Sequence, residues 1–183
     1  MLLTLTSQQI EQALPKVQPG LTKYCWLQEH LDKFDVAASR EFQKRYNGFY
    51  RVRRSVLWQS PYFALLESAK RAPITFEAAL SQLFDATGQV EASFASKLVA
   101  TLDPSLPVID KFVLAQAGLT LPRADAADRQ ATIVDVYAQL TTKLHHFAQS
   151  PTGKALLTRF QAVYPQSKLS TIKMIDLVLW QMR

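Results

Sequence analysis

Apolar residues recur three and four positions apart along most of the chain, which is the period of an amphipathic α-helix. The clearest case is the stretch 125–148, where one side carries a continuous apolar stripe: Ile133, Val136, Tyr137, Leu140, Leu144 and Phe147. No segment alternates long enough to found a sheet, and the extended-looking run 48–55 is too short. The pattern therefore predicts an all-α fold, a compact multi-helix bundle of about eight to ten helices.

Proline, glycine and capping residues divide this pattern into elements. In the first half, Ser7 is expected to cap a short helix and Pro19-Gly20 to break the chain. Helices are then predicted over 21–34, over 36–46 with Asn47-Gly48 as the stop, and over 54–71. Pro61 predicts either a kink in the last of these or a helix that begins at Ser60-Pro61.

In the second half, Thr75 and Ser170 are expected to cap helices, and Ser150-Pro151 to start one. The predicted helices span 76–86, 90–102, 108–117, 125–148, 151–164 and 171–183, with Gly88 and Gly118 as stop signals. In the last of them, Asp176 stands among apolar residues, which indicates an exposed edge or an ion pair with an arginine.

The length of 183 residues suits one domain with a real hydrophobic core. No internal repeat, low-complexity segment or linker interrupts it. We therefore expect residues 1–183 to form a single all-helical domain, whose weakest seam lies near Ala72-Pro73.

The beginning of the chain lacks a basic start and reaches polar residues within six positions, so it predicts neither a signal peptide nor an anchor. No apolar run approaches the roughly 18 residues that span a bilayer. A single cysteine, Cys25, excludes an internal disulfide and a cysteine-based zinc cluster, and we expect it to be a buried apolar filler. A cytoplasmic location follows as the expectation, with no membrane partner.

The net charge of +6 is concentrated in one segment. Residues 40–71 include eight basic and two acidic residues, so this segment carries a charge of +6, equal to the net charge of the whole chain. Localised positive charge is typical of nucleic-acid binders, although a solvated basic face is the alternative. The candidate nucleic-acid contacts are Lys44, Arg45, Arg51, Arg53 and Arg54.

Aromatic residues interleave with this basic segment, the mixture that stacks bases and neutralises phosphates. They are Trp26, Tyr46, Phe49, Tyr50, Trp58, Tyr62 and Phe63. Aromatics at helical spacing are equally typical of a packed core, and both interpretations stay open.

Several kinds of site find no support. The five glycines form neither a dinucleotide fingerprint nor a phosphate-binding loop, so no cofactor is expected. His145 and His146 are adjacent, and adjacent helical residues point about 100° apart, which does not favour a metal site.

One segment is less ordinary. A helix carrying Ser93, Ser96 and Lys97 precedes a proline turn, and Asp110 lies where the next helix begins. A carboxylate there is stabilised by the helix dipole. The plain interpretation is a solvated lysine and a helix-terminal acid.

The run Ser93-Phe-Ala-Ser-Lys97, followed by Leu106-Pro-Val-Ile-Asp110-Lys-Phe-Val and by Gly118-Leu119, resembles a segment of the helix-hairpin-helix DNA glycosylase superfamily, especially its 8-oxoguanine DNA glycosylase-like branch. The resemblance covers about residues 88–119 and implies a glycosylase-like arrangement of helices. It implies that Lys97 is the nucleophile that attacks the anomeric carbon of a sugar, and that Asp110 stabilises the developing positive charge.

Two functions are therefore expected as alternatives. The first is a DNA-binding protein resembling base-excision glycosylases, which excises a damaged base through Lys97 and Asp110. The second is a non-catalytic helical protein that acts as a nucleic-acid-binding accessory or a protein-interaction module.

Overall fold

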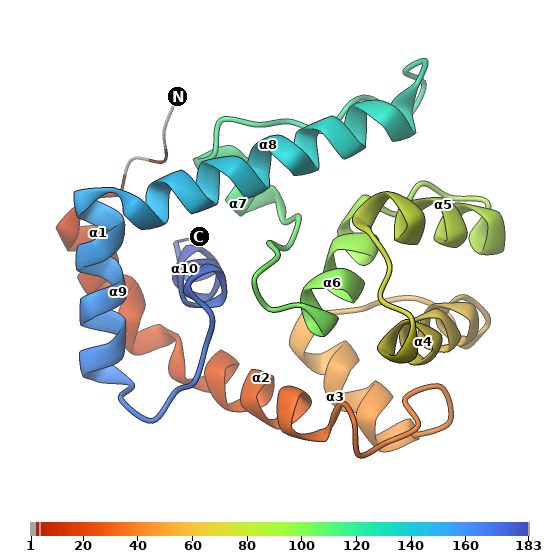
Figure 1. Ribbon diagram of the computed structural model, residues 1–183, viewed down its shortest axis with the longest axis horizontal. Coiled ribbons are helices and arrows are strands. Elements are labelled where there is room, and N and C mark those ends of the chain that lie inside the picture. Colours follow the sequence, from red (N-terminus) through yellow and green to blue (C-terminus); the bar gives the residue numbers. More distant parts are fainter. Residues whose placement is uncertain (1–2, 4, 183) are drawn as a thin grey trace. The chain divides into compact units, whose positions relative to one another are not determined.

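The computed structural model describes residue 3 and residues 5–182, and this part of the chain contains ten α-helices, one 3-10 turn and no β-strand. About 68% of it is helical, which confirms the all-α prediction. The chain divides into two compact units (Figure 1). We call Pro19–Leu102 the central unit, and Met1–Gln18 together with Asp103–Arg183 the terminal unit. Ala72-Pro73 lies inside the central unit.

The central unit is built around an aromatic core. Its helices are α2 (Gln18–His30), α3 (Arg40–Tyr50), α4 (Val56–Arg71), α5 (Phe76–Thr87) and α6 (Ala92–Leu102). Tyr46 lies at the centre, and its ring contacts those of Phe42, Tyr50, Tyr62 and Phe63. The hydroxyls of Tyr46 and Tyr62 lie 2.6 Å apart, and burial raises the pKa of both. The buried hydroxyls of Tyr46 and Tyr62 thus serve as each other's hydrogen-bond partners.

Two predicted chain breaks in the central unit are wrong. Pro19-Gly20 lies in the first turn of α2, where a proline loses no helical hydrogen bond. Asn47-Gly48 lies within α3, which continues for one more half-turn to Tyr50. Phe49 and Tyr50 are both buried, and the burial of two aromatic side chains outweighs the roughly 1 kcal/mol that a helical glycine costs.

Helix α4 begins at Val56, so the predicted start at Ser60-Pro61 is also wrong. The Ser55 hydroxyl accepts a hydrogen bond from the Trp58 amide and caps the helix there. Pro61 removes only the hydrogen bond to the Leu57 carbonyl, which lies in an exposed first turn where water can replace it.

The terminal unit is built around its last helix, α10. Its elements are α1 (Ser7–Ala13), η1 (Leu14–Lys16), α7 (Lys111–Gln116), α8 (Arg129–Gln149), α9 (Pro151–Val163) and α10 (Thr171–Leu179). Helix α10 packs against α1, α7, α8 and α9 (Figure 1), and every residue from Ile172 to Leu179 is buried. Ser150 and Ser170 cap α9 and α10 as predicted.

Helix α10 carries a buried ion pair that differs from both sequence-based interpretations of Asp176. Asp176 is 1% exposed and accepts a hydrogen bond of 2.9 Å from Lys173, which is 0% exposed. The predictions of an exposed edge or an arginine partner are therefore wrong. The lysine lies three residues earlier on the same helix, the spacing at which helical side chains meet.

Two helices of the terminal unit approach each other closely at a glycine. A Cβ atom at Gly153 would lie 1.9 Å from the carbonyl oxygen of Phe147, so only glycine fits there. The predicted caps at Thr75 and Gly88 are confirmed, whereas α1 is capped by Thr6 instead of Ser7. Among the described residues, no helix is both long and apolar enough to cross a membrane.

Candidate nucleic-acid interface

Helix α3 ends in a left-handed turn formed by an arginine. Arg51 has φ 55° and ψ 43°, and the amides of Arg51 and Val52 both donate to the carbonyl of Asn47. The Val52 bond is the 6→1 bond of the Schellman motif and the Arg51 bond is that of the αL motif, and in both the left-handed position is usually glycine. A side chain there costs roughly 1–2 kcal/mol, so Arg51 occupies its place at the expense of stability.

The loop that follows is exposed except at Val52. Val52 is buried and anchors the turn, while Arg51 and Arg53 are exposed. Neither arginine pairs with an acid in the described part of the chain. Their charges therefore contribute no ion pair to the fold.

Arg54 has a different role. Its Nη2 atom lies 2.7 Å from Oε1 of Glu91, a carboxylate in a residue that is only 7% exposed. The guanidinium also lies 5.3 Å from the ring of Phe94 and 5.5 Å from that of Trp58. Arg54 thus neutralises a nearly buried acid and ties the loop to α6.

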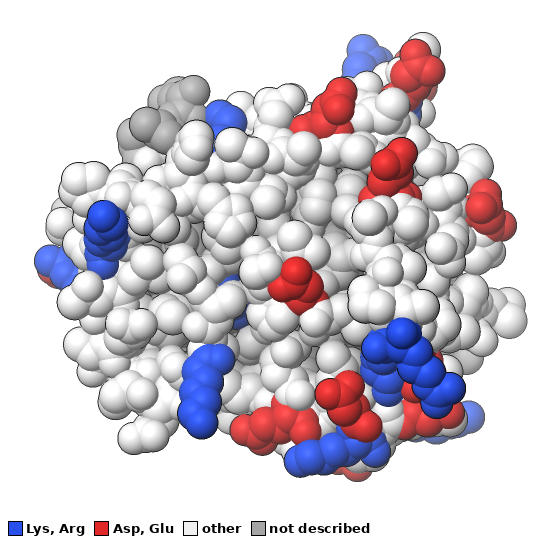
Figure 2. All heavy atoms as spheres, viewed as in Figure 1, with Lys and Arg blue, Asp and Glu red and all other residues white. Residues whose placement is uncertain are grey.

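Helix α3 carries the remaining predicted contacts. Arg45 forms an exposed ion pair of 3.1 Å with Glu41, whereas Lys44 is exposed and has no acidic partner among residues that the structure describes. Arg40, which the sequence-based set omitted, is equally exposed and unpaired in that range, at the helix start where a positive charge is disfavoured. In the lower right of Figure 2, basic and acidic side chains lie next to one another.

A groove lies between α3 and the beginning of α4. Its volume is about 580 Å³, and we call it the α3–α4 groove. Cationic Arg40 and Lys44 line it together with apolar Val56. The other lining residues are small or carry amides and hydroxyls: Ala37, Ala38, Gln43, Asn47, Gln59 and Ser60. Such a lining offers charges for phosphates and hydrogen-bonding groups for base edges.

The two most exposed large apolar side chains of the described chain begin α4, and one of them, Val56, lines this groove. Val56 is 81% exposed and Leu57 is 87% exposed, in the first turn of α4. Neither residue belonged to the sequence-based candidate set, and no pattern in the sequence marks their exposure.

The aromatic residues of the segment divide into two groups. Tyr46, Phe49, Tyr50, Tyr62 and Phe63 are buried, which confirms the core interpretation for them. Trp26 and Trp58 are only half-buried. These two indoles are therefore the aromatic groups of the segment that a ligand can reach.

Lys97 belongs to the central unit and Asp110 to the terminal unit, and the joint role that the resemblance implies for them stays a prediction. Lys97 is half-buried on α6, where its ammonium donates to Ser93 Oγ at 3.0 Å and lies 4.7 Å from the Phe94 ring centre. Asp110 is the N-cap of α7, and its carboxylate accepts the Phe112 amide at 2.8 Å. Each residue thus has a local structural partner.

Other reactive residues show no assembled site. No group of three metal-ligating side chains occurs among the residues described, and His145 and His146 are exposed on α8. Cys25 is half-buried and not fully enclosed as expected, and burial, followed by the nearby charge of Glu29, raises the pKa of its thiol.

Comparisons with protein-family models, with curated proteins and with solved structures find no match to this chain. The resemblance to helix-hairpin-helix glycosylases therefore rests on the residues quoted for it, and the roles that it implies for Lys97 and Asp110 stay predictions.

Proposed function

We propose that this protein binds duplex DNA through the surface formed by the α3–α4 groove and the arginine turn that precedes α4. The observation that carries the proposal is the combination of four exposed cations without acidic partners in the described chain and two exposed aliphatic side chains. The cations are Arg40, Lys44, Arg51 and Arg53.

The cations would contact phosphates. Arg40 and Lys44 lie one helical turn apart on α3, and both line the groove. Arg51 and Arg53 stand on either side of buried Val52 in the adjoining turn. Each neutralised phosphate releases counterions, so affinity should fall with salt by about 0.9 logarithmic units per contact and decade of salt.

The aliphatic pair would contact bases. Leaving Val56 and Leu57 in water forgoes roughly 1.5–3 kcal/mol for each side chain, which a partner's apolar surface would recover. Aliphatic side chains beside arginines can insert between base steps, where the exposed ring faces are apolar. This combination favours nucleic acid over an acidic protein.

Base excision is the chemistry that the family resemblance adds. The Lys97 amine would form a bond to the anomeric carbon of the sugar while the bond to the base breaks, and the proton that the amine then loses would pass to the departing base. Asp110 would stabilise the positive charge on the sugar. The amine must lose its proton and release Ser93 Oγ before it attacks.

A non-catalytic nucleic-acid-binding protein is the second candidate. It is favoured by the local roles of both residues, since Lys97 binds Ser93 and Asp110 caps α7. Both candidates share the same binding surface and differ only in covalent chemistry.

The binding surface is tested by titrating labelled duplex DNA at several salt concentrations. We expect the double variant Arg51→Gln/Arg53→Gln to bind at least 10-fold more weakly, with a salt slope lower by about 1.8. Lys154→Gln/Lys168→Gln removes the same charge from exposed positions of the terminal unit and should change affinity less than about 2-fold. No detectable binding of the natural protein at about 50 mM salt would remove the proposal.

The chemistry is tested with borohydride and duplexes that contain damaged bases. Trapping by the natural protein that disappears in Lys97→Gln, with DNA affinity unchanged, supports excision. Equal absence of trapping in both proteins supports the non-catalytic candidate. Trapping that survives in Lys97→Gln assigns the nucleophile to another residue.

A further inference from the structure

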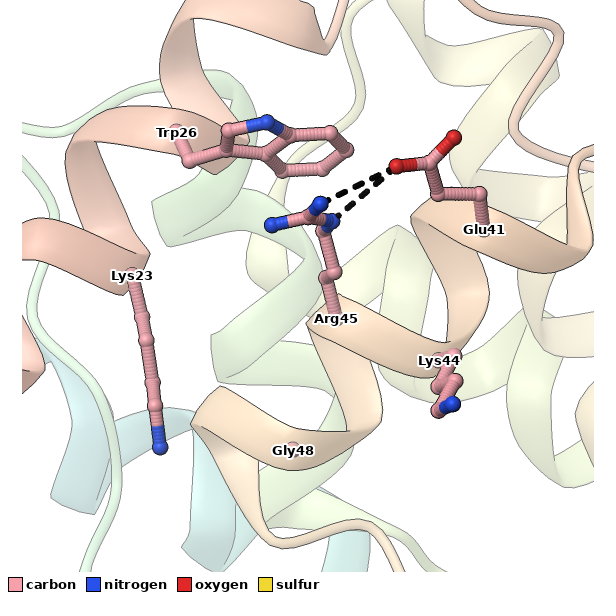
Figure 3. A pocket seen from close by; sticks show the side chains of 6 residues that line it. All are labelled: Lys23, Trp26, Glu41, Lys44, Arg45 and Gly48. Atoms are coloured by element: carbon pink, nitrogen blue, oxygen red, sulfur yellow. Dashed lines mark hydrogen bonds and ion pairs between the residues drawn. The ribbon is translucent and has the colours of Figure 1, made fainter.

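A second pocket of the central unit lies between α2 and α3, on a face of α3 that adjoins the α3–α4 groove at Lys44. Its volume is about 400 Å³, within the range of small-molecule sites. Figure 3 shows the residues that line it: Lys23 and Trp26 from α2, and Glu41, Lys44, Arg45 and Gly48 from α3. We call it the Trp26 pocket.

Arg45 is held in place inside this pocket. Its guanidinium lies 4.1 Å from the centre of the Trp26 ring, and its Nε and Nη2 atoms donate to one oxygen of Glu41 at 3.2 and 3.1 Å (Figure 3). Stacking and hydrogen bonding thus fix the plane of the guanidinium, which carries five N–H donors in total. Donors beyond those used for Glu41 are available to a ligand.

The pocket lining is positively charged. The lining contains three cations and one carboxylate, and that carboxylate is already paired with Arg45. Lys23 and Lys44 are exposed and pair with no acid in the described part of the chain. A net charge of about +2 complements a phosphate monoester, which carries about −1.5 to −2 at neutral pH.

The walls suit a planar ring as well as a phosphate. The Trp26 ring is stacked on His30 at 4.1 Å and contacts Arg45, so the two helices present a ladder of flat groups. Nucleobases stack on the planes of arginine guanidinium groups as they do on aromatic rings. One ligand class satisfies both requirements, a phosphate monoester joined to a planar base.

We infer that the Trp26 pocket binds a nucleoside monophosphate unit, with the phosphate held by the remaining donors of Arg45 and by the flexible Lys23 side chain, and the base against the Trp26–Arg45 ladder. Such a unit is either a free mononucleotide or the phosphorylated end of a nucleic-acid strand. The pocket shares Lys44 with the α3–α4 groove, whereas Arg40, Arg51, Arg53 and Val56 do not line it. Variants at Arg51 and Arg53 therefore test the duplex surface without touching this pocket.

Gly48 provides a way to close the pocket without disturbing the fold. It lies in the interior of α3, and a Cβ atom added there meets no atom within 4 Å. Leucine is also a better helix former than glycine. Gly48→Leu should therefore fill the pocket in a stable protein, and Gly48→Ala is the matched control that leaves most of the space open.

The experiment is calorimetric titration at low salt with deoxyadenosine monophosphate, deoxyadenosine and inorganic phosphate. We expect the monophosphate to bind at least 10-fold more tightly than either of the other two. Gly48→Leu should weaken it at least 10-fold, and Gly48→Ala less than about 3-fold. Lys23→Gln should weaken it several-fold and lower the salt dependence.

Two results would overturn the inference: no binding of the monophosphate at 10 mM, or equal binding by Gly48→Leu and the natural protein. Arg51→Gln/Arg53→Gln should keep its affinity for the monophosphate, which separates a failure of this site from a failure of the duplex surface.

Competition identifies the source of the ligand. A 5′-phosphorylated oligonucleotide that displaces the monophosphate, beside a 5′-hydroxyl one that does not, indicates a strand end; equal failure of both indicates a free nucleotide.

Discussion

Lys173 and Asp176 of the terminal unit are enclosed by packed side chains and neutralise each other, whereas Arg51 and Arg53 of the central unit stand in solvent on a turn that a glycine would adopt more easily. Both arrangements cost folding free energy, the first because two charges are buried and the second because Arg51 has a left-handed backbone. In the terminal unit the cost is offset by a partner inside the protein. In the central unit no partner within the described chain offsets it, and the proposed duplex binding would supply one.

Separating the buried pair is expected to have the largest effect. Asp176→Leu alone leaves the Lys173 ammonium without its carboxylate in the core and should lower the free energy of unfolding by about 3–5 kcal/mol. The double variant Lys173→Met/Asp176→Leu should recover most of this loss. Urea unfolding followed by circular dichroism measures both, and Glu41→Gln, which breaks an exposed pair, should lose less than about 1 kcal/mol.

Alkaline pH should act on the core of the central unit. Burial holds the pKa of Tyr46 and Tyr62 above the ordinary value near 10, so the unfolded chain loses these protons first. The stabilisation is complete below pH 10 and is lost as pH rises toward the folded-state pKa, by roughly 1 kcal/mol per tyrosine and pH unit. Tyrosinate absorbance should rise together with unfolding. Ionisation of all tyrosines in a folded chain would contradict the buried cluster.

One glycine in each unit gives a matched pair of alanine substitutions. Gly153→Ala would bring Cβ to 1.9 Å from the Phe147 carbonyl oxygen and should destabilise the terminal unit by about 1–3 kcal/mol. Gly48→Ala meets open space within a helix and should stabilise the central unit by roughly 0.5–1 kcal/mol. Opposite shifts of the thermal midpoint are the expected result, and equal shifts would show that the two helix environments are alike.

The smallest expected change in stability is at Arg51, where one substitution should affect folding and DNA binding in opposite directions. Arg51→Gly relieves the left-handed strain and should stabilise the protein by up to about 1 kcal/mol. The same substitution removes one phosphate contact and should weaken duplex binding several-fold. A loss of stability would mean that the Arg51 side chain contributes to the fold, and would weaken the comparison between the two units.

Much of the fold was predictable because it depends on local chemistry. The caps at Thr75, Ser150 and Ser170 were found from the hydrogen bond that a hydroxyl offers to the first turn. The stop predicted at Asn47-Gly48 is wrong because it was inferred from these two residues alone. Helix α3 continues past them because Phe49 and Tyr50 are buried in tertiary contacts, which the local sequence does not reveal.

The candidate site was less predictable. Lys44, Arg51 and Arg53 stood out by charge alone, but no sequence pattern distinguishes Arg54, which pairs with Glu91 thirty-seven residues later. The contact of Arg45 with Trp26 joins two helices and has no signature in the order of residues. The exposure of Val56 and Leu57 depends on which side of α4 the core occupies.

The five-residue connection between α3 and α4 is fastened at alternate positions, by buried Val52 and by the Arg54–Glu91 pair. Its shape is therefore set before any partner arrives, and binding would immobilise little more than the ends of two arginine side chains. Loops that must first become ordered lose part of their affinity to that step. In the proposed complex with DNA this entropic cost would already have been met during folding, which makes the connection a preorganised binding loop.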